Sequence, residues 1–243
     1  MSMKNVAVTR MLALYSKEFR EYRRNRSIVA TMAVIPLGIV FFPLIEVLAA
    51  PASAASALLK GDPLVILLGI PAILPSILAG YAIVGEREQG TLEPMLTTPI
   101  QRSELLLAKA LAALVPTLAV AYVVYALFLT ITRLFAQPAI AAAVLQGPDL
   151  LVQILFTPLI AFLSIWVAIG ISTRSSDVRV AQQLAAITGL PTLLVAYLAA
   201  FNVIPATLGV ALVIATALLI LDGIGWRIVS ALFDRERLIT GTS

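Results

Sequence analysis

The sequence contains no cysteine and no histidine. Zinc sites built on these residues, disulfides, thiol nucleophiles and acid–base schemes that rely on an imidazole are therefore excluded. Charge is scarce too: 12% of the 243 residues are acidic or basic, which is about half the share found in soluble domains. No phosphate-binding loop of the Gly-x-x-x-x-Gly-Lys-Ser/Thr type occurs, so the chain is not expected to hydrolyse ATP or to hold a catalytic site.

Apolar residues, by contrast, make up 60% of the chain and give it a mean hydropathy of +1.01. A water-soluble fold of this composition would expose large apolar patches, so we expect an integral membrane protein. Six segments are long enough to cross about 30 Å of hydrocarbon, and we expect helices because an open sheet leaves backbone groups unpaired in lipid. The predicted fold is all-α and polytopic, with spans at 28–48, 64–84, 105–132, 151–172, 184–201 and 207–226.

Several prolines fall inside these predicted spans. Neighbouring helices in a membrane can satisfy the carbonyl groups that a proline leaves free. We therefore expect kinked helices, and not interrupted ones, at Pro36, Pro43, Pro71, Pro75, Pro116, Pro158 and Pro191.

The distribution of basic residues predicts the orientation of the chain. Six crossings place both termini on one side, and Lys60 and Arg133 are then the only two of the 17 lysines and arginines on the other. Because short basic loops stay in the cytoplasm, both termini and the loops 85–104 and 173–182 are predicted to be cytoplasmic. The chain is thus expected to be a multi-pass protein of a bacterial or archaeal plasma membrane. The net charge of +4 reflects this orientation, and no nucleic-acid partner is expected.

This layout divides the chain into an N-terminal helix at 1–26, a six-helix domain at 27–227 and a cytoplasmic tail at 228–243. Within residues 4–26 the apolar side chains recur at spacings of three and four, which predicts an amphipathic helix. Such a helix can anchor at the membrane surface through anionic headgroups, and it can also pack on a cytoplasmic partner; both interpretations stay open. The expected apolar face holds Val8, Met11, Leu12, Tyr15, Phe19 and Tyr22, with Lys17, Glu18, Glu21 and Arg24 on other faces.

The loop at 85–104 carries the most informative pattern in the chain. Gly90 permits a tight turn after an acidic cluster, and Thr91 can cap a short new helix that has Glu93 in its first turn. A connection between antiparallel helices needs only about 2–8 residues, so we interpret this longer loop as a docking element. Its helix would place three apolar side chains on one face: Leu92, Met95 and Leu96.

The third span has a start signal of its own. Thr98 as N-cap, Pro99 at the first helical position and Gln101 at the third have the layout of a capping box. The helix is therefore predicted to begin in the cytoplasm and to enter the membrane through Glu104 and Lys109.

The segment 86–99 reads EREQGTLEPMLTTP and resembles the signature of the type-2 permease family of ATP-binding-cassette exporters. Weaker likenesses to the same family occur at 20–26, 177–183 and 233–238, so the resemblance covers nearly the whole chain. It implies two permeases, either identical or related, together with two separate ATPase subunits. ATP and magnesium would be bound by the ATPase, and this chain would hold no cofactor and no metal.

The resemblance also implies which residues couple the permease to the ATPase. The expected coupling residues are Glu86, Arg87, Glu88, Gly90, Thr91, Leu92, Glu93, Met95 and Leu96, and a second contact is expected at Asp177, Arg179 and Gln182. Many relatives have an extended segment between the fifth and sixth spans, for which residues 202–206 leave no room. Any outer lid is therefore expected to be short or to come from residues 133–150.

Two acids lie inside predicted spans, Glu46 near the outer end and Asp222 near the inner end. An acid at mid-bilayer costs roughly 3 kcal/mol to insert and often marks a transport path. Because both acids lie close to a membrane surface, a substrate path and simple interfacial anchoring are equally compatible with the sequence. The largely apolar spans favour export of a hydrophobic or amphipathic cargo, drug-like or lipid-like, and an ion remains an alternative.

Three rival functions are compatible with parts of the sequence. An ion-coupled secondary transporter would show acids near the midplane and a repeat between halves, and neither is apparent. An intramembrane enzyme could use Glu86 and Glu88 to chelate magnesium, although Arg87 stands between them. A membrane interaction protein that transports nothing would not need a helix for docking at this place. Co-purification with an ATPase subunit would separate the exporter from all three.

Overall fold

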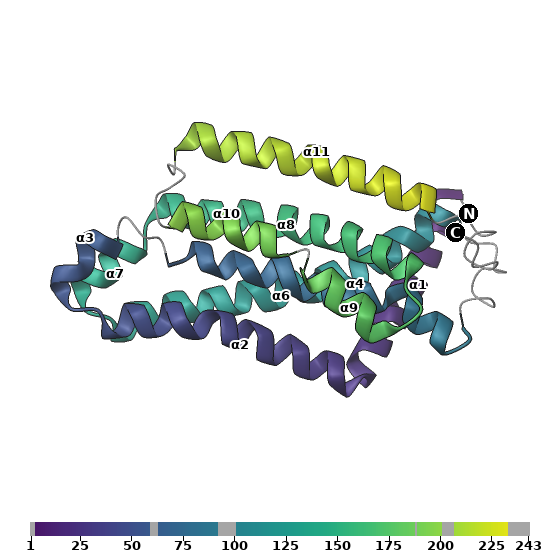
Figure 1. Cartoon of the computed structure of the whole chain (residues 1–243), viewed down its shortest axis with the longest axis horizontal. Coiled ribbons are helices and arrows are strands. Elements are labelled where there is room, and N and C mark those ends of the chain that lie inside the picture. Colours follow the sequence, from purple (N-terminus) through teal and green to yellow (C-terminus); the bar gives the residue numbers. More distant parts are fainter. Residues whose placement is uncertain (1–2, 59–62, 92–100, 188, 201–206, 233–243) are drawn as a thin grey trace.

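The computed structural model describes residues 3–58, 63–91, 101–187, 189–200 and 207–232. Every regular element in these ranges is a helix, and six are long and apolar enough to cross a membrane, which confirms the predicted fold class. The helices run side by side along one axis (Figure 1). They are α2 (Arg26–Ala49), η2 (Val65–Leu68) continuing into α4 (Gly69–Glu88), α6 (Arg102–Phe135), α8 (Gly147–Arg174), α9 (Val178–Ile187) followed by α10 (Leu190–Ala200), and α11 (Leu208–Leu232).

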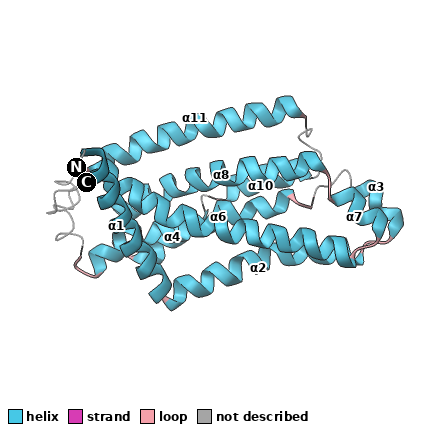
Figure 2. Cartoon of the chain, turned by 180° about the vertical axis from the view of Figure 1, so that it is seen from behind, coloured by secondary structure: helices cyan, strands magenta, loops and turns pink. Residues whose placement is uncertain are grey.

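Helix α1 (Met3–Arg24) lies across one end of this bundle (Figures 1 and 2). It ends where the basic run begins to interrupt the apolar pattern, and Asn25 then turns the chain. The Asn25 side-chain oxygen accepts hydrogen bonds from the backbone N–H groups of Ser27 and Ile28, at 3.1 and 3.3 Å. This side chain therefore caps α2, because the first N–H groups of a helix have no partner within the helix.

The central helix of the bundle is α4, which packs against α8, α9, α6 and α2. Most of its residues are buried, while α2 and α11 are mostly exposed and lie on opposite sides of the bundle (Figure 1). An apolar helix whose outer face is exposed is what a lipid-facing position requires. The bundle is thus arranged as one buried helix surrounded by helices that present apolar side chains outward.

The fifth span differs from its prediction. A single helix was expected over 184–201, but the structure has two: α9 ends at Ile187 and α10 begins at Leu190. Pro191 accounts for the break, because it has no N–H to donate to the Ile187 carbonyl and its ring crowds that carbonyl. Gly189 also fits a close approach to α4: a Cβ there would lie 2.9 Å from the carbonyl oxygen of Ala72.

The prolines fall into two groups. Pro36, Pro43, Pro75, Pro116 and Pro158 lie inside helices that continue past them, as predicted. Pro71 and Pro191 instead lie in the first turn of α4 and α10. The expectation of a kink without an interruption is wrong for Pro191, which lies where one helix ends and another begins, whereas at Pro71 the helical chain runs on from η2 into α4.

The start of the third span also differs from its prediction. Helix α6 begins at Arg102, with Gln101 as the N-cap and Glu104 in the third helical position. The Glu104 carboxylate accepts a hydrogen bond from the Gln101 N–H at 3.2 Å, so the capping box lies three residues later than the one expected at Thr98. A glutamate and a glutamine fill the third position of such boxes equally well. The sequence therefore could not distinguish a capping box that starts at Thr98 from one that starts at Gln101.

At the end opposite α1, short helices form a small cap (Figure 1). Helix α7 (Pro138–Val144) packs against η1 (Ala52–Ala54) and α3 (Ala55–Leu58). Its buried side chains Ile140 and Val144 join a cluster with Val47 and Phe128 from the long helices. Within residues 133–150, one of the sources considered from the sequence for an outer lid, α7 is therefore a packed element.

Candidate functional site

A buried ion cluster joins three helices at the end of the bundle that carries α1. At its centre is Lys109 of α6, whose side chain is 0% exposed. Its Nζ lies 2.9 Å from Glu18 Oε1 of α1 and 2.9 Å from Glu86 Oε2 of α4, and it donates a hydrogen bond to the Ala82 carbonyl oxygen at 2.8 Å. One ammonium group thus connects α1, α4 and α6.

Lys17 completes the ion cluster from its solvent side. Its Nζ lies 2.7 Å from Glu86 Oε1, 3.2 Å from Glu21 and 3.7 Å from Glu18. Each carboxylate oxygen of Glu86 therefore faces a different lysine. We use the term ion cluster for Lys17, Glu18, Glu86 and Lys109 from here on.

The ion cluster fixes α1 against the bundle. An uncompensated buried charge costs several kcal/mol, so removing one partner of a buried pair typically destabilises a protein by about 3–5 kcal/mol. Apolar packing reinforces the attachment, because Leu14 and Tyr22 of α1 lie in the main core cluster, and the Tyr22 hydroxyl donates to the Leu78 carbonyl oxygen at 3.3 Å. The N-terminal helix, for which a surface anchor and a contact with a cytoplasmic partner were both left open, is therefore an integral part of the helical packing at this end.

Protonation of the α1 side chains follows from the same contacts. Burial raises the pKa of Glu18, with the nearby charge of Lys109 acting in the opposite direction. Burial alone would lower the pKa of Lys17, but the hydrogen bond and charge of Glu86, together with Glu18 and Glu21, outweigh it and raise this pKa above its usual 10.5. Burial also raises the pKa of Tyr22, so its hydroxyl stays protonated.

The chain leaves α4 through a tight turn at Gly90, as predicted. Gly90 has φ +68°, a left-handed conformation that favours glycine. Its N–H donates to the Arg87 carbonyl oxygen at 3.1 Å, and the Thr91 N–H donates to that of Glu86 at 2.9 Å. These two bonds form a Schellman motif, which satisfies the last carbonyls of the helix. The Thr91 hydroxyl also donates to the Glu86 carbonyl, at 3.3 Å.

Two further side chains form hydrogen bonds between this turn and the connection from α8 to α9. Arg87 donates to the carbonyl oxygens of Ser175 and Thr173, at 2.8 and 3.3 Å, and Glu88 accepts from the Val178 N–H at 3.0 Å. The end of α4, the end of α8 and the start of α9 therefore form one continuous surface next to the ion cluster.

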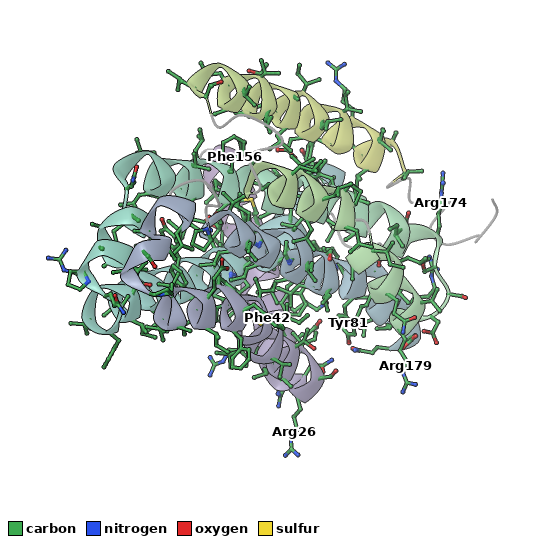
Figure 3. The ribbon with its side chains drawn as sticks, turned by 60° about the vertical axis from the view of Figure 1, so that its left-hand side comes forward. Arg26, Phe42, Tyr81, Phe156, Arg174 and Arg179 are labelled. Atoms are coloured by element: carbon green, nitrogen blue, oxygen red, sulfur yellow. The ribbon has the colours of Figure 1, made fainter. Side chains whose placement is uncertain are left out.

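The residues expected at a second contact are divided between surface and interior. Asp177 caps α9, since its Oδ1 accepts hydrogen bonds from the N–H groups of Arg179 and Val180 at 2.7 and 3.0 Å. The Arg179 side chain points away from the bundle (Figure 3). Gln182 instead faces α4 and donates to the Ile77 carbonyl oxygen at 3.2 Å. Asp177 and Arg179 thus belong to the surface and Gln182 to the packing between helices.

The predicted coupling residues that the structure describes are also divided between the interior and the turn. Glu86 is buried in the ion cluster and not on the surface, whereas Arg87, Glu88, Gly90 and Thr91 shape the turn. The carboxylates of Glu86 and Glu88 face different partners, so they do not form the paired magnesium ligands considered from the sequence. The remaining predicted residues lie outside the described part of the chain: Leu92, Glu93, Met95 and Leu96.

The two acids of the predicted substrate path are not brought together. Glu46 is exposed on α2, while Asp222 is half-buried on α11, on the other side of the bundle (Figure 1). The Oδ1 atom of Asp222 is buried and has no hydrogen-bond partner among the described residues.

Sequence reasoning missed the roles of Lys17, Glu18 and Lys109. Glu18 was assigned to a polar face of α1, and Lys109 was treated as a charge flanking the membrane. A signal was present, because Lys109 interrupts the apolar run 105–115, and a lone cation in such a run needs a buried counter-charge. The counter-charges come from residues far away in sequence, which no local pattern reveals.

Comparison with known proteins shows which family the chain resembles. A family model described as ABC-2 family transporter protein matches residues 12–226, which is most of the chain and includes the whole ion cluster. No curated protein matches the sequence.

Proposed function

The chain belongs to the ABC-2 family of transporter proteins, and from that premise we propose that it is the membrane-spanning permease subunit of an ATP-driven exporter. Membrane subunits of this family generally pair with an ABC ATPase, and the six apolar helices make this one a multi-pass membrane protein. In the proposed complex two permeases and two ATPase subunits assemble, and ATP and magnesium bind to the ATPase. The permease itself performs no chemistry. Its termini and the turn at Gly90 face the cytoplasm.

The observation that supports this proposal is the position of the ion cluster beside the connection between α4 and α6. Glu86 and Lys109 flank that connection, and both are paired with Glu18 or Lys17 of α1. A force applied to the connection by a partner would therefore move α1, α4 and α6 together. Discrete rearrangements of packed helices of this kind are how closure of one subunit can reshape another.

The coupling surface follows from this arrangement. Leu92, Met95 and Leu96 would supply the apolar contact with the ATPase, and Glu93 would supply charge complementarity. Glu86 would act inside the permease by linking the moving segment to α1, while Arg87 and Glu88 would pass the movement to α8 and α9 through Ser175 and Val178. Asp177 and Arg179 would form the second contact.

The proposed cargo is hydrophobic or amphipathic and moves out of the cell. The outer faces of α2 and α11 present mostly apolar side chains, which suits a lipid-like or drug-like molecule. An exported ion is the alternative cargo, and Asp222 with its buried, unpartnered oxygen is the residue that would favour it.

The test is co-purification of the full-length chain from its native membrane in mild detergent. We expect an ATPase subunit, recognised in the mass spectrum by its phosphate-binding loop, to be recovered in a 1:1 ratio with the permease. The substitution Leu92→Asp should remove it by placing a charge in the apolar contact. The matched control is Ala139→Asp, an apolar-to-acid change on the exposed side of α7 at the other end. Equal loss in both variants, or an unchanged ratio in Leu92→Asp, would contradict the proposed coupling surface.

A further inference from the structure

Helices α8 and α11 enclose an apolar cleft near the end of the bundle that carries α1. The cleft has a volume of about 250 Å³, and the described residues that line it all belong to these two helices. Both helices are candidate membrane spans, so lipid would surround them in a bilayer. Residues that define it are Trp166, Gly170 and Arg174 of α8 and Gly225, Val229 and Leu232 of α11.

Two glycines shape the cleft. At Gly225 the helices are in close contact, since a Cβ there would lie 2.9 Å from the Trp166 Cβ. At Gly170, by contrast, the nearest atom that an added Cβ would meet among the described residues is a Val229 methyl carbon, 3.8 Å away. Gly170 therefore leaves open space where any larger side chain would fill the cleft.

The size and lining of the cleft restrict what it can hold. An apolar cavity of about 150 Å³ stays dry and takes a molecule the size of benzene, whereas sites for drug-sized ligands occupy roughly 300–1,000 Å³. A cleft between these limits fits part of an acyl chain. An unfilled one would leave its walls without dispersion contacts, and the surrounding bilayer supplies chains to fill it.

The charge at the mouth of the cleft restricts which lipid headgroup can bind there. Arg174 is the last residue of α8 and points away from the helices (Figure 3). It forms no ion pair with any residue in the described ranges, and none of the described residues that line the cleft is acidic. A guanidinium group matches a phosphate with two parallel hydrogen bonds, and basic residues at a membrane surface attract anionic lipids. We propose that the cleft is a binding site for an anionic phospholipid, with one acyl chain between α8 and α11 and its phosphate paired with Arg174.

The test uses the two tryptophans of the chain as reporters. Trp226→Phe leaves Trp166, which lines the cleft, as the single emitter. The full-length variant is placed in phosphatidylcholine vesicles that contain 10 mol% of either phosphatidylglycerol or phosphatidylcholine with brominated chains. Because bromine quenches only at short range, we expect at least twofold stronger quenching of Trp166 by the brominated phosphatidylglycerol. Both leaflets have the same composition, so the result does not depend on orientation.

Matched variants separate charge from shape. Arg174→Gln should abolish the preference for phosphatidylglycerol, and Arg227→Gln, which removes an exposed arginine of α11 outside the cleft, should preserve it. Gly170→Leu should reduce quenching by both lipids, while Gly223→Leu, where an added Cβ meets no atom within 4 Å, should not. Native mass spectrometry of the unsubstituted chain should retain at least one phosphatidylglycerol, a readout that tolerates failure of any variant to fold.

Two results would overturn the proposal. The first is equal quenching by the two brominated lipids, or a preference that survives Arg174→Gln. The second is weak quenching by both lipids that increases when residues 233–243 are deleted, because the chain's own C-terminal segment would then be the occupant.

Discussion

The Lys109 ammonium lies 2.9 Å from a carboxylate oxygen of Glu18, although the two residues are 91 positions apart in the sequence. Both side chains are almost completely buried. This contact, with the equally short one from Lys109 to Glu86, makes the N-terminal helix part of the structure that surrounds the connection between α4 and α6.

Replacing Lys109 by methionine should strongly destabilise the protein, because two buried carboxylates lose their common partner. The expected loss is about 3–5 kcal/mol, which corresponds to a midpoint of thermal unfolding roughly 10 °C lower for a chain of this size. Tryptophan fluorescence of the detergent-solubilised protein measures the midpoint.

The double variant Lys109→Met/Glu18→Gln provides the control for this effect. It removes one positive and one negative charge and leaves the Lys17–Glu86 pair in place, so it should recover part of the loss. A double variant less stable than Lys109→Met alone would show that the charges are not coupled as described.

The raised pKa of Lys17 should make its amine slow to acylate. Only the neutral amine reacts, and each unit of pKa lowers the neutral fraction about tenfold at a given pH. At pH 9 we expect Lys17 to react at least tenfold more slowly than a lysine in a short peptide, as measured by peptide mass spectrometry. Glu86→Gln should restore most of the reactivity and Glu21→Gln little of it, since Glu86 is the closer partner. Equal effects of the two substitutions would contradict the assigned contacts.

The same shift determines the pH dependence of stability. The pKa of Lys17 is raised on folding above its usual 10.5, so its contribution is fully present below about pH 10.5 and is lost as pH rises through the raised value. The unfolding midpoint of the native chain should therefore not fall on account of Lys17 between pH 7 and pH 10. A decrease in that window that is absent from Lys17→Met would contradict this sign.

Gly80 should not tolerate a larger side chain. A Cβ at this position would lie 3.3 Å from the Gln182 Cα and 3.4 Å from the Ala181 carbonyl oxygen, both backbone atoms of α9. Gly80→Val should therefore push α9 from α4 and cost about 1–3 kcal/mol, measured as a lower unfolding midpoint. Gly38→Val is the matched control on α2, where an added Cβ meets no atom within 4 Å. Similar losses in both variants would indicate a general effect of valine in a helix.

The effect of a substitution at Gly90 should depend on whether the new side chain is β-branched, and not on its size. At φ +68° a β-branched residue is strained by roughly 1–2 kcal/mol, whereas asparagine adopts this conformation readily. Gly90→Val should lower the amount of ATPase that co-purifies while leaving the unfolding midpoint of the bundle within a few degrees, and Gly90→Asn should behave like the native chain. If asparagine were as harmful as valine, the left-handed turn would not be the reason.

The sequence predicts the fold well because its strongest signals are local. Apolar length alone places the spans, the glycine at position 90 predicts the turn, and the spacing of apolar side chains within residues 4–26 predicts α1. The errors are also local ambiguities: two capping frames, at Thr98 and Gln101, fit the start of α6, and Pro191 can kink a helix or begin one.

The candidate site could be predicted only in part, because its most informative contacts join distant segments. Glu86 was identified as functional from its position in the loop, but nothing nearby in the sequence indicates that it faces Lys109 and Lys17. The polar face of α1 is similarly ambiguous, since Glu18 could lie toward water or toward a buried cation. Only packing of α1 against α4 and α6 decides between these possibilities.

The central claim is that a separate ATPase acts on the segment between α4 and α6. Because the chain has no cysteine, a single introduced thiol gives a site-specific cross-link without background. Leu92→Cys, in the native membrane and with a short thiol–amine cross-linker, should yield a covalent adduct with a subunit whose peptides contain a phosphate-binding loop, in an amount that changes when ATP is added. Leu134→Cys, exposed near the far end of α6, should yield none. An adduct with the ATPase from Leu134→Cys and not from Leu92→Cys, or no ATPase adduct from either, would contradict the account.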